Sequence, residues 1–236
     1  ESRDFVKQEG SGYNSFRGSV GWSESTLNRG TFATRGHSQS LTGEITLPGS
    51  DLSFYRVDYN GQVYKPLWKK DYALRFHTHL GYADSFENTS QLPFFEHYYA
   101  GGFSSVRGFR DNSMGPRSTP NASDPSQTPQ PFGGNVLITG GAELLFPTPF
   151  VKDQHSLRTV LFWDMGNVFD TNCSTQQKKR GESGCNLSLS DMGSTVGVGM
   201  NWLTAMGPLS FSIGMPIKQP SNSNTQLFQF SLGQTF

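Results

Sequence analysis

The sequence predicts an all-β protein, specifically an antiparallel transmembrane β-barrel. Its last ten residues alternate between large apolar residues and small or polar ones. The apolar set is Phe228, Phe230, Leu232 and Phe236, and the opposite set is Gln229, Ser231, Gly233 and Thr235. A period of two is that of a strand with one apolar face, which a barrel strand presents to lipid. No apolar run reaches the ~18 residues of a membrane helix, and several alternating segments match the ~9–11 residues of a membrane-crossing strand.

The first four predicted strands are 11–23, 41–47, 53–64 and 72–82, each with its apolar residues on one parity. These residues are Phe16, Val20 and Trp22; Leu41, Ile45 and Leu47; Tyr55, Val57, Tyr59 and Val63; and Leu74, Phe76, Leu80 and Tyr82. The opposite parity is mostly polar or charged, and in the fourth strand it holds Arg75, His77 and His79. Such side chains suit the polar lumen of a barrel.

The five remaining predicted strands are 135–146, 158–169, 194–202, 209–215 and 226–236. The clean alternation before the terminal strand comes from Val136, Ile138, Ala142 and Leu144; Val196, Val198, Met200 and Trp202; and Leu209, Phe211, Ile213 and Met215. Segment 158–169 carries apolar residues on both faces. The small residues opposite the apolar ones favour a wet barrel over a packed soluble β-sandwich, which is the alternative with the same period.

Composition restricts the classes of partner and the compartment. The chain has 19 basic and 19 acidic residues, so no net field draws it to nucleic acid. A mean hydropathy of −0.50 is compatible with a membrane barrel, because half of each strand faces the lumen. No signal peptide begins the chain, so we expect that it was removed or that the chain is the tail of a longer protein.

The predicted connections are short at 67–71, 147–154 and 204–208 and long at 84–133 and 169–193. Outer-membrane barrels combine short periplasmic turns with longer extracellular loops in this way. The first part of loop 84–133 is aromatic over residues 94–103, so it needs cover, and the barrel interior is the place that offers it.

Loop 84–133 contains Val106-Arg107-Gly108-Phe109, which resembles the motif loop of BamA-like barrels in the outer-membrane insertase superfamily. Four further blocks are similar to the same family in the same order: 144–150, 162–171, 206–212 and the terminal 228–236. The resemblance covers the chain from about residue 94 to its end, and the first ninety residues match only as generic strands.

The resemblance implies a sixteen-stranded barrel preceded by periplasmic POTRA domains. The chain is then roughly the last nine strands of one barrel domain over 1–236, without the POTRA domains and leading strands. It also implies an assembly factor that folds and inserts β-barrel proteins into the bacterial outer membrane. The lateral gate would lie at the seam of first and last strands, so Phe228, Phe230, Leu232 and Phe236 belong to its edge. The expected partners are unfolded outer-membrane proteins, lipoproteins bound through the missing POTRA domains, the lipid bilayer and, at open strand edges, further copies of the chain.

The same resemblance implies that the motif loop folds into the lumen, where Arg107 meets Glu143 and Asp164 on the inner wall. Parity independently turns Glu143 to the polar face of its strand. A guanidinium forks onto carboxylates, and such pairs are strong where water is scarce. Gly108 would permit a tight turn beside Val106, and Phe109 would pack on the wall. The alternative is a surface loop with a solvated arginine.

Cys173 and Cys185 are too few for a four-ligand structural zinc site, so we expect a disulfide in an oxidising compartment. A loop of this size contributes on the order of 3 kcal/mol by restricting the unfolded chain. We expect no enzyme, metal or cofactor, because the common hydrolase, metalloprotease and P-loop motifs are absent and His77 and His79 lack a third ligand. Barrel proteases and phospholipases, a passive porin, and a two-partner secretion or translocation-assembly barrel are the alternatives.

Overall fold

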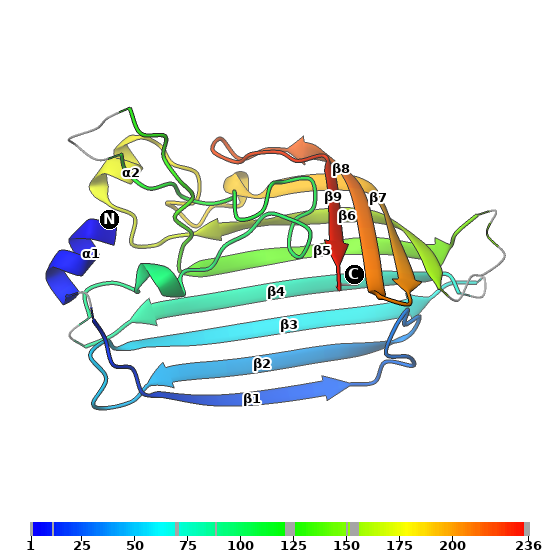
Figure 1. Cartoon of the computed structure of the whole chain (residues 1–236), viewed down its shortest axis with the longest axis horizontal. Helices are drawn as coiled ribbons and strands as arrows, with labels where there is room; N and C mark the ends of the chain where they lie inside the picture. Colours follow the sequence, from blue (N-terminus) through cyan, green and yellow to red (C-terminus); the bar gives the residue numbers. More distant parts are fainter. Residues whose placement is uncertain are drawn as a thin grey trace.

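The computed structural model describes residues 2–10, 12–68, 71–87, 89–120, 126–149, 151 and 156–233. Nine antiparallel strands form one curved sheet in chain order (Figure 1). They are β1 Arg17–Ser25, β2 Gly36–Thr46, β3 Phe54–Pro66, β4 Ala73–Ser85, β5 Val136–Pro147, β6 Leu157–Phe169, β7 Gly193–Thr204, β8 Gly207–Lys218 and β9 Phe228–Leu232. Because β1 and β9 end the strand order, the described sheet is an open part of a barrel.

Helices are short and lie outside the sheet: α1 Ser2–Glu9, α2 Thr175–Lys179 and the 3-10 turns η1 Phe94–Glu96 and η2 Leu189–Asp191. In the described part of the chain, no helix has the length and apolar character needed to span a membrane. The connections 86–135, 170–192 and 219–227 lie at the same end of the sheet as α1 and α2 (Figure 1).

All nine predicted strands are present, with different bounds. The first begins at Arg17 instead of residue 11, whereas β2 begins at Gly36, five residues before the prediction of 41. β2 is longer because its polar start remains in register with β3, from Gly36 opposite Tyr64. The predicted start at residue 41 was too late, because the prediction used apolar residues alone and the first residues of β2 are small or polar. The predicted end of the terminal strand at Phe236 lies outside the described residues, and its place at the membrane interface stays a prediction.

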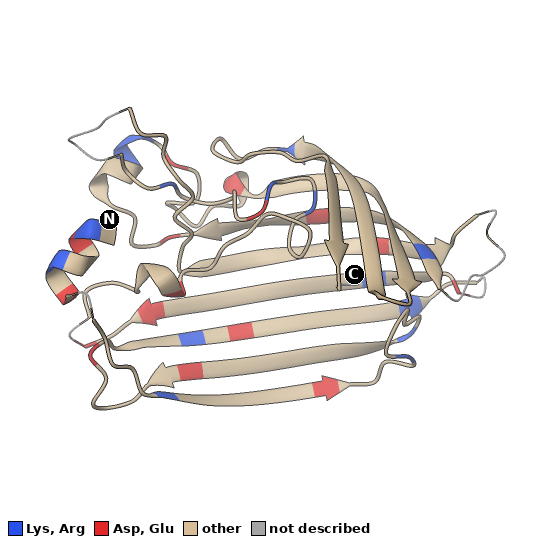
Figure 2. Cartoon of the chain, viewed as in Figure 1, with Lys and Arg blue, Asp and Glu red and all other residues tan. Residues whose placement is uncertain are grey.

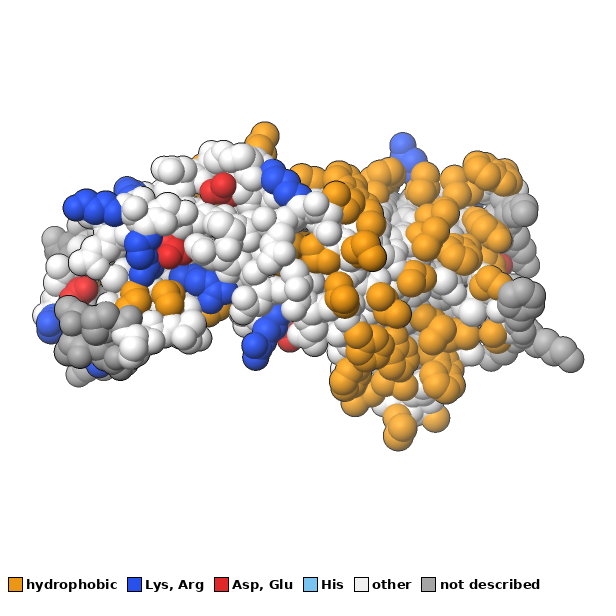
Figure 3. Space-filling view, turned by 90° about the horizontal axis from the view of Figure 1, so that it is seen from above, with side chains coloured by type: hydrophobic (Ala, Val, Ile, Leu, Met, Phe, Trp, Pro, Cys, Tyr) orange, Lys and Arg blue, Asp and Glu red, His pale blue; other side chains and the backbone are white. Residues whose placement is uncertain are grey.

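The outward face of the sheet is apolar and exposed. Val20 is 77% exposed, Ile213 58% and Phe230 65%. Figure 3 shows apolar side chains gathered over the strand-bearing half of the molecule, whereas polar and charged side chains cover the loop-bearing end. Charged residues are also sparse along the strands (Figure 2). In water such a surface would be unfavourable by about 25 cal/mol per Å², whereas hydrocarbon accepts it.

Part of the inward face is covered by the connection between β4 and β5, which folds back over the concave side of the sheet near β5–β9 (Figure 1). Its buried apolar residues join the wall in one cluster: Phe54, Ala83, Leu92, Tyr98, Ala100, Val106, Phe109, Met114, Leu137 and Val168. Tyr98 is 3% exposed and Ala100 1%, so the aromatic part of the loop finds its cover inside the barrel. The loop thereby takes Arg107 to the inner wall.

Candidate functional site

The inner wall of the sheet carries a buried ion cluster built around Arg107. Its Nε donates to Asp164 Oδ2 at 2.7 Å, and its Nη2 donates to Asp164 Oδ1 at 2.8 Å and to Glu143 Oε1 at 2.6 Å. The backbone N–H of Arg107 also donates to Asp164 Oδ2, at 3.2 Å. The three side chains are only 1–3% exposed. This is the bidentate geometry that makes guanidinium–carboxylate pairs strong.

The two carboxylates come from neighbouring strands of the wall. Glu143 lies on β5 opposite Phe162 of β6, and Asp164 is two residues further along β6, on the same face. The Phe162 ring lies against the guanidinium, with Arg107 Cζ 3.8 Å from its centroid. β6 therefore supplies a carboxylate and an aromatic face to one cation. Its inward apolar residues are also explained, because Phe162 and Val168 pack against the loop and Val160 packs against other residues of the wall.

A second cation, Arg75 of β4, completes the cluster. Arg75 lies opposite Glu143 in register, and its Nη1 donates to Glu143 Oε2 at 2.9 Å. His77 lies further off, with Nε2 3.9 Å from Asp164 Oδ1. Two guanidiniums thus balance two carboxylates, as burial of charge requires. Alternation in the sequence places Arg75 on the polar face but assigns it no role; the available signal is that it faces the lumen as Glu143 does.

The turn after Arg107 brings the loop against strands β7 and β8. Gly108 has a φ of +86°, and a Cβ there would lie 3.1 Å from Thr195 Cγ2 and 3.2 Å from the Gly214 carbonyl oxygen. Glycine is the residue that tolerates this conformation and approach. Val106 and Phe109, on either side of Arg107 and Gly108, are both 0% exposed. The four motif residues therefore lie inside the barrel, not on its surface.

The terminal strand β9 joins the site through Gln229. The Gly108 N–H donates to Gln229 Oε1 at 3.1 Å, and Gln229 Nε2 donates to the Phe109 carbonyl at 2.6 Å. Phe228, Phe230 and Leu232 point outward, at 55%, 65% and 62% exposure, whereas Gln229 is 4% exposed. Alternation in the sequence predicts that Gln229 faces the lumen. It does not reveal the partner of Gln229, because Phe109 is 120 residues away in the chain.

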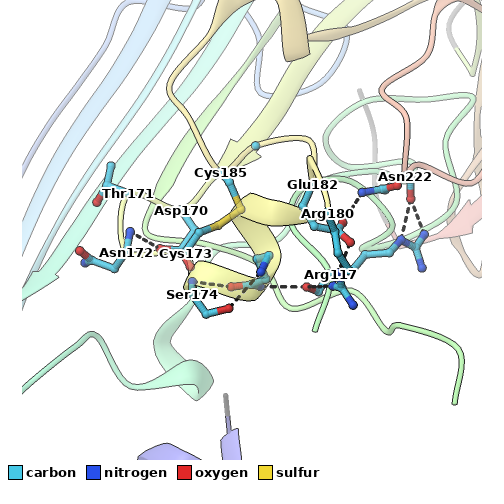
Figure 4. Close-up of a disulfide and its surroundings, with 12 residues drawn as sticks. Arg117, Asp170, Thr171, Asn172, Cys173, Ser174, Arg180, Glu182, Cys185 and Asn222 are labelled. Atoms are coloured by element: carbon cyan, nitrogen blue, oxygen red, sulfur yellow. Dashed lines mark hydrogen bonds and ion pairs between the residues drawn. A yellow bond between two sulfur atoms is a disulfide. The ribbon is translucent and has the colours of Figure 1, made fainter. Parts of the chain in front are cut away.

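The predicted disulfide is present between Cys173 and Cys185, with a Cα–Cα distance of 5.5 Å (Figure 4). It closes the connection between β6 and β7 around α2. The helix begins with a reciprocal cap, in which Ser174 Oγ accepts from the Gln177 N–H and Gln177 Oε1 accepts from the Ser174 N–H. Local structure and the covalent link thus hold the same short segment.

This stapled segment ties two other connections together (Figure 4). Gln177 Nε2 donates to the Arg117 carbonyl at 2.8 Å, and Arg117 Nε donates to the Asn222 carbonyl at 2.7 Å. Asn222 Nδ2 also donates to the Glu182 carboxylate, which pairs with Arg180 at 2.9 Å. The β4–β5, β6–β7 and β8–β9 connections are therefore linked at one end of the sheet.

We expect alkylation to find no free thiol in protein that is made in an oxidising compartment and then denatured without reductant. Denaturation removes the protection by burial, so only the covalent link between Cys173 and Cys185 can block the reagent. Mass spectrometry of the labelled chain is the measurement, and a parallel sample treated with reductant should carry two labels. Two labels in the unreduced sample would contradict the disulfide.

The fold, the apolar outer face and the loop packed against the inner wall define part of a transmembrane β-barrel. The chain matches the Omp85 superfamily domain over residues 2–236, and it belongs to that superfamily. It is thus an integral outer-membrane protein, in agreement with the family resemblance of the motif blocks.

Two curated relatives are similar over much of the chain. It is 33% identical over 233 residues to the outer membrane protein assembly factor BamA of Neisseria meningitidis serogroup B, which covers 94% of this chain and 29% of that protein. It is 27% identical over 147 residues to BamA of Nitratidesulfovibrio vulgaris, which covers 61% of this chain and 16% of that protein. The chain therefore spans less than a third of the length of either relative.

A solved structure shares the fold. The crystal structure of BamA from Haemophilus ducreyi lacking POTRA domains 1-3 superimposes with a TM-score of 0.82 at 32% identity. The match covers 97% of this chain and 46% of the crystallised one.

Proposed function

We propose that this chain is the C-terminal part of the barrel of an outer-membrane protein assembly factor, which folds and inserts β-barrel proteins into the bacterial outer membrane. Both curated relatives are named outer membrane protein assembly factors. The observation that carries the proposal is the connection of the buried Arg107 cluster to the terminal strand through Gly108, Phe109 and Gln229. A loop that packs in the lumen and also binds the last strand fits a barrel in which the seam between the first and last strands opens for the client.

The proposed mechanism is non-enzymatic and uses the backbone edge of β9. This strand pairs with β8 on one side, from Leu209 opposite Leu232 to Ile213 opposite Phe228. Its other edge would pair with the first strand of the complete barrel and open to a client, which adds strands by β-augmentation. The free energy would come from folding the client into lipid, so neither a nucleotide nor a metal is needed.

The partners follow from this mechanism: unfolded outer-membrane proteins at the β9 edge, lipid around the apolar face, and assembly lipoproteins bound through POTRA domains of the parent protein. The passive porin is disfavoured, because loop residues such as Val106, Arg107 and Phe109 are buried in the lumen that a porin keeps open. A two-partner secretion or translocation-assembly barrel is disfavoured by the names of the relatives.

Photo-crosslinking in proteoliposomes tests the proposal. The parent protein would carry a photoreactive residue in place of Leu232, with Val198 of β7 as a matched outward-facing control, and would receive an unfolded outer-membrane protein. We expect the client to fold at least tenfold faster than in empty liposomes and to crosslink severalfold more at 232 than at 198. Equal crosslinking would contradict the gate at β9, and ion conductance without client folding would favour the porin.

A further inference from the structure

The side chain of Gln229 links the inward face of β9 to the motif backbone, next to a backbone hydrogen bond of 2.9 Å from the Gln226 N–H to the Gly108 carbonyl. Of the two inward residues of β9, Gln229 and Ser231, only Gln229 is long enough to reach both Gly108 and Phe109. Its amide accepts from the first at 3.1 Å and donates to the second at 2.6 Å. A carboxamide can do both at once, because its oxygen accepts and its nitrogen donates.

The partner of Gln229 is held in place independently of β9. Arg107, the residue before Gly108, is bound to Glu143 on β5 and to Asp164 on β6. Gly108 then lies on β8, so close that a Cβ added to Gly214 would come within 3.0 Å of both the Gly108 nitrogen and Cα. The motif backbone is therefore held in a fixed position on the wall, and hydrogen bonds to it can set the position of β9.

Alternation of apolar and polar residues excludes a slip of β9 by one residue but not every slip by two residues. A slip by one residue would turn Phe228 or Phe230 into the lumen, which the apolar pattern forbids. A slip by two residues that brings Ser231 to the position of Gln229 keeps Phe228, Phe230 and Leu232 on the outward face. It would, however, leave Ser231 beside the motif, and its side chain is too short to make both hydrogen bonds of Gln229. The opposite slip would place the apolar Leu227 in the lumen, which the apolar pattern already disfavours. Gln229 thus distinguishes registers that the hydrophobic pattern cannot.

We propose that Gln229 is a positioning residue that selects one register of the terminal strand by reading the backbone of Gly108 and Phe109. The inference rests on the proposed function for its purpose: a strand that separates for a client has to return to one register. Burial strengthens the selection, because Gln229 is 4% exposed and a lost partner would leave buried polar groups unsatisfied.

Cysteine pairs on the outward face report the register without touching the lumen. Phe211 lies opposite Phe230, so Phe211→Cys with Phe230→Cys forms the native pair. After a two-residue slip that brings Ser231 to the position of Gln229, residue 230 would lie opposite residue 213, so Ile213→Cys with Phe230→Cys reports the slipped state. Both pairs would be oxidised in the membrane-embedded parent protein, and free thiols counted after denaturation by maleimide labelling.

We expect the native pair to close at least tenfold more than the slipped pair when Gln229 is present. Gln229→Leu should raise the ratio of slipped to native closure at least fivefold. The matched control is Gln226→Leu, because Gln226 is exposed and its side chain donates to the Phe228 carbonyl, whereas its contact with Gly108 is made by the backbone N–H, which leucine keeps. Closure in that variant should equal the unmodified protein.

Exchange of the two inward residues, Gln229→Ser with Ser231→Gln, is the decisive variant, because it keeps composition and alternation and moves the amide by two positions. It should make the slipped pair predominate. An unchanged ratio in this variant, or in Gln229→Leu, would overturn the proposal. Client folding is measured on the same samples, so a parent protein that inserts no client but shows these register shifts would refute the proposed function alone.

Discussion

Replacement of Arg107 by alanine in the parent protein should lower the free energy of unfolding of the barrel by about 3–5 kcal/mol, the range for removing one partner of a buried ion pair. The change leaves Asp164 without its guanidinium and takes one of two cations from Glu143. Both carboxylates are 1% exposed, so water cannot replace the lost donors. The denaturant midpoint of the barrel in detergent, followed by its mobility on unboiled gels, is the measurement.

Arg17→Ala is the matched control. Arg17 also bridges two carboxylates, Glu44 at 3.0 Å and Glu96 at 2.6 Å, but its side chain is 36% exposed. An exposed pair contributes at most about 1 kcal/mol, so the midpoint should move little. Arg107→Lys should fall between the two variants, since lysine keeps the charge and loses the fork. Equal losses for Arg107→Ala and Arg17→Ala would show that burial of the cluster does not govern stability.

The sequence contained enough information for the strands, because a membrane barrel repeats one simple rule along its whole length. Lipid demands an apolar residue at every second position, and no tertiary contact overrides that demand. The exception is the start of β2, where His37, Ser38 and Gln39 carry no apolar signal and only the pairing with β3 reveals the strand.

The site could be predicted where the family resemblance supplied it. Parity placed Glu143 on the inward face, whereas the pairing of Arg107 with Glu143 and Asp164 followed from the resemblance of the motif blocks, and the structure brings these three residues together. Arg75 and Gln229 could not be assigned, because their partners depend on strand register and on the path of a fifty-residue loop. Neither quantity is written in local patterns, and both are set by packing inside the barrel.

Gly197→Val is the second variant for which a large loss is expected, about 3 kcal/mol, at the upper end of overpacking. Gly197 of β7 lies opposite Phe162 of β6, and its missing side chain leaves room for the Phe162 ring. A Cβ there would overlap the Ile213 carbonyl oxygen and the ring, whose Cε1 would be 2.8 Å away. The ring would have to leave the position in which it lies against Arg107.

Gly43→Val is the matched control within the same sheet, since a Cβ at Gly43 meets only Val20 Cγ1, at the ordinary distance of 3.9 Å. It should change the denaturant midpoint much less than Gly197→Val does. If both variants shift it equally, the loss reflects the general cost of a larger strand residue, not displacement of Phe162.

A double-mutant cycle then separates the ring from the strand. Part of the loss in Gly197→Val is the contact between Phe162 and Arg107, and that contact is already absent in Arg107→Ala. The two changes combined should therefore destabilise by less than the sum of the single losses, with a coupling of about 1 kcal/mol, as for residues that share a partner. Strict additivity would mean that the glycine supports only the pairing of β7 with β8. Coupling would instead show that a residue on β7, one strand from the nearest carboxylate ligand Asp164, helps to hold the motif loop, and through Gln229 the terminal strand, in place.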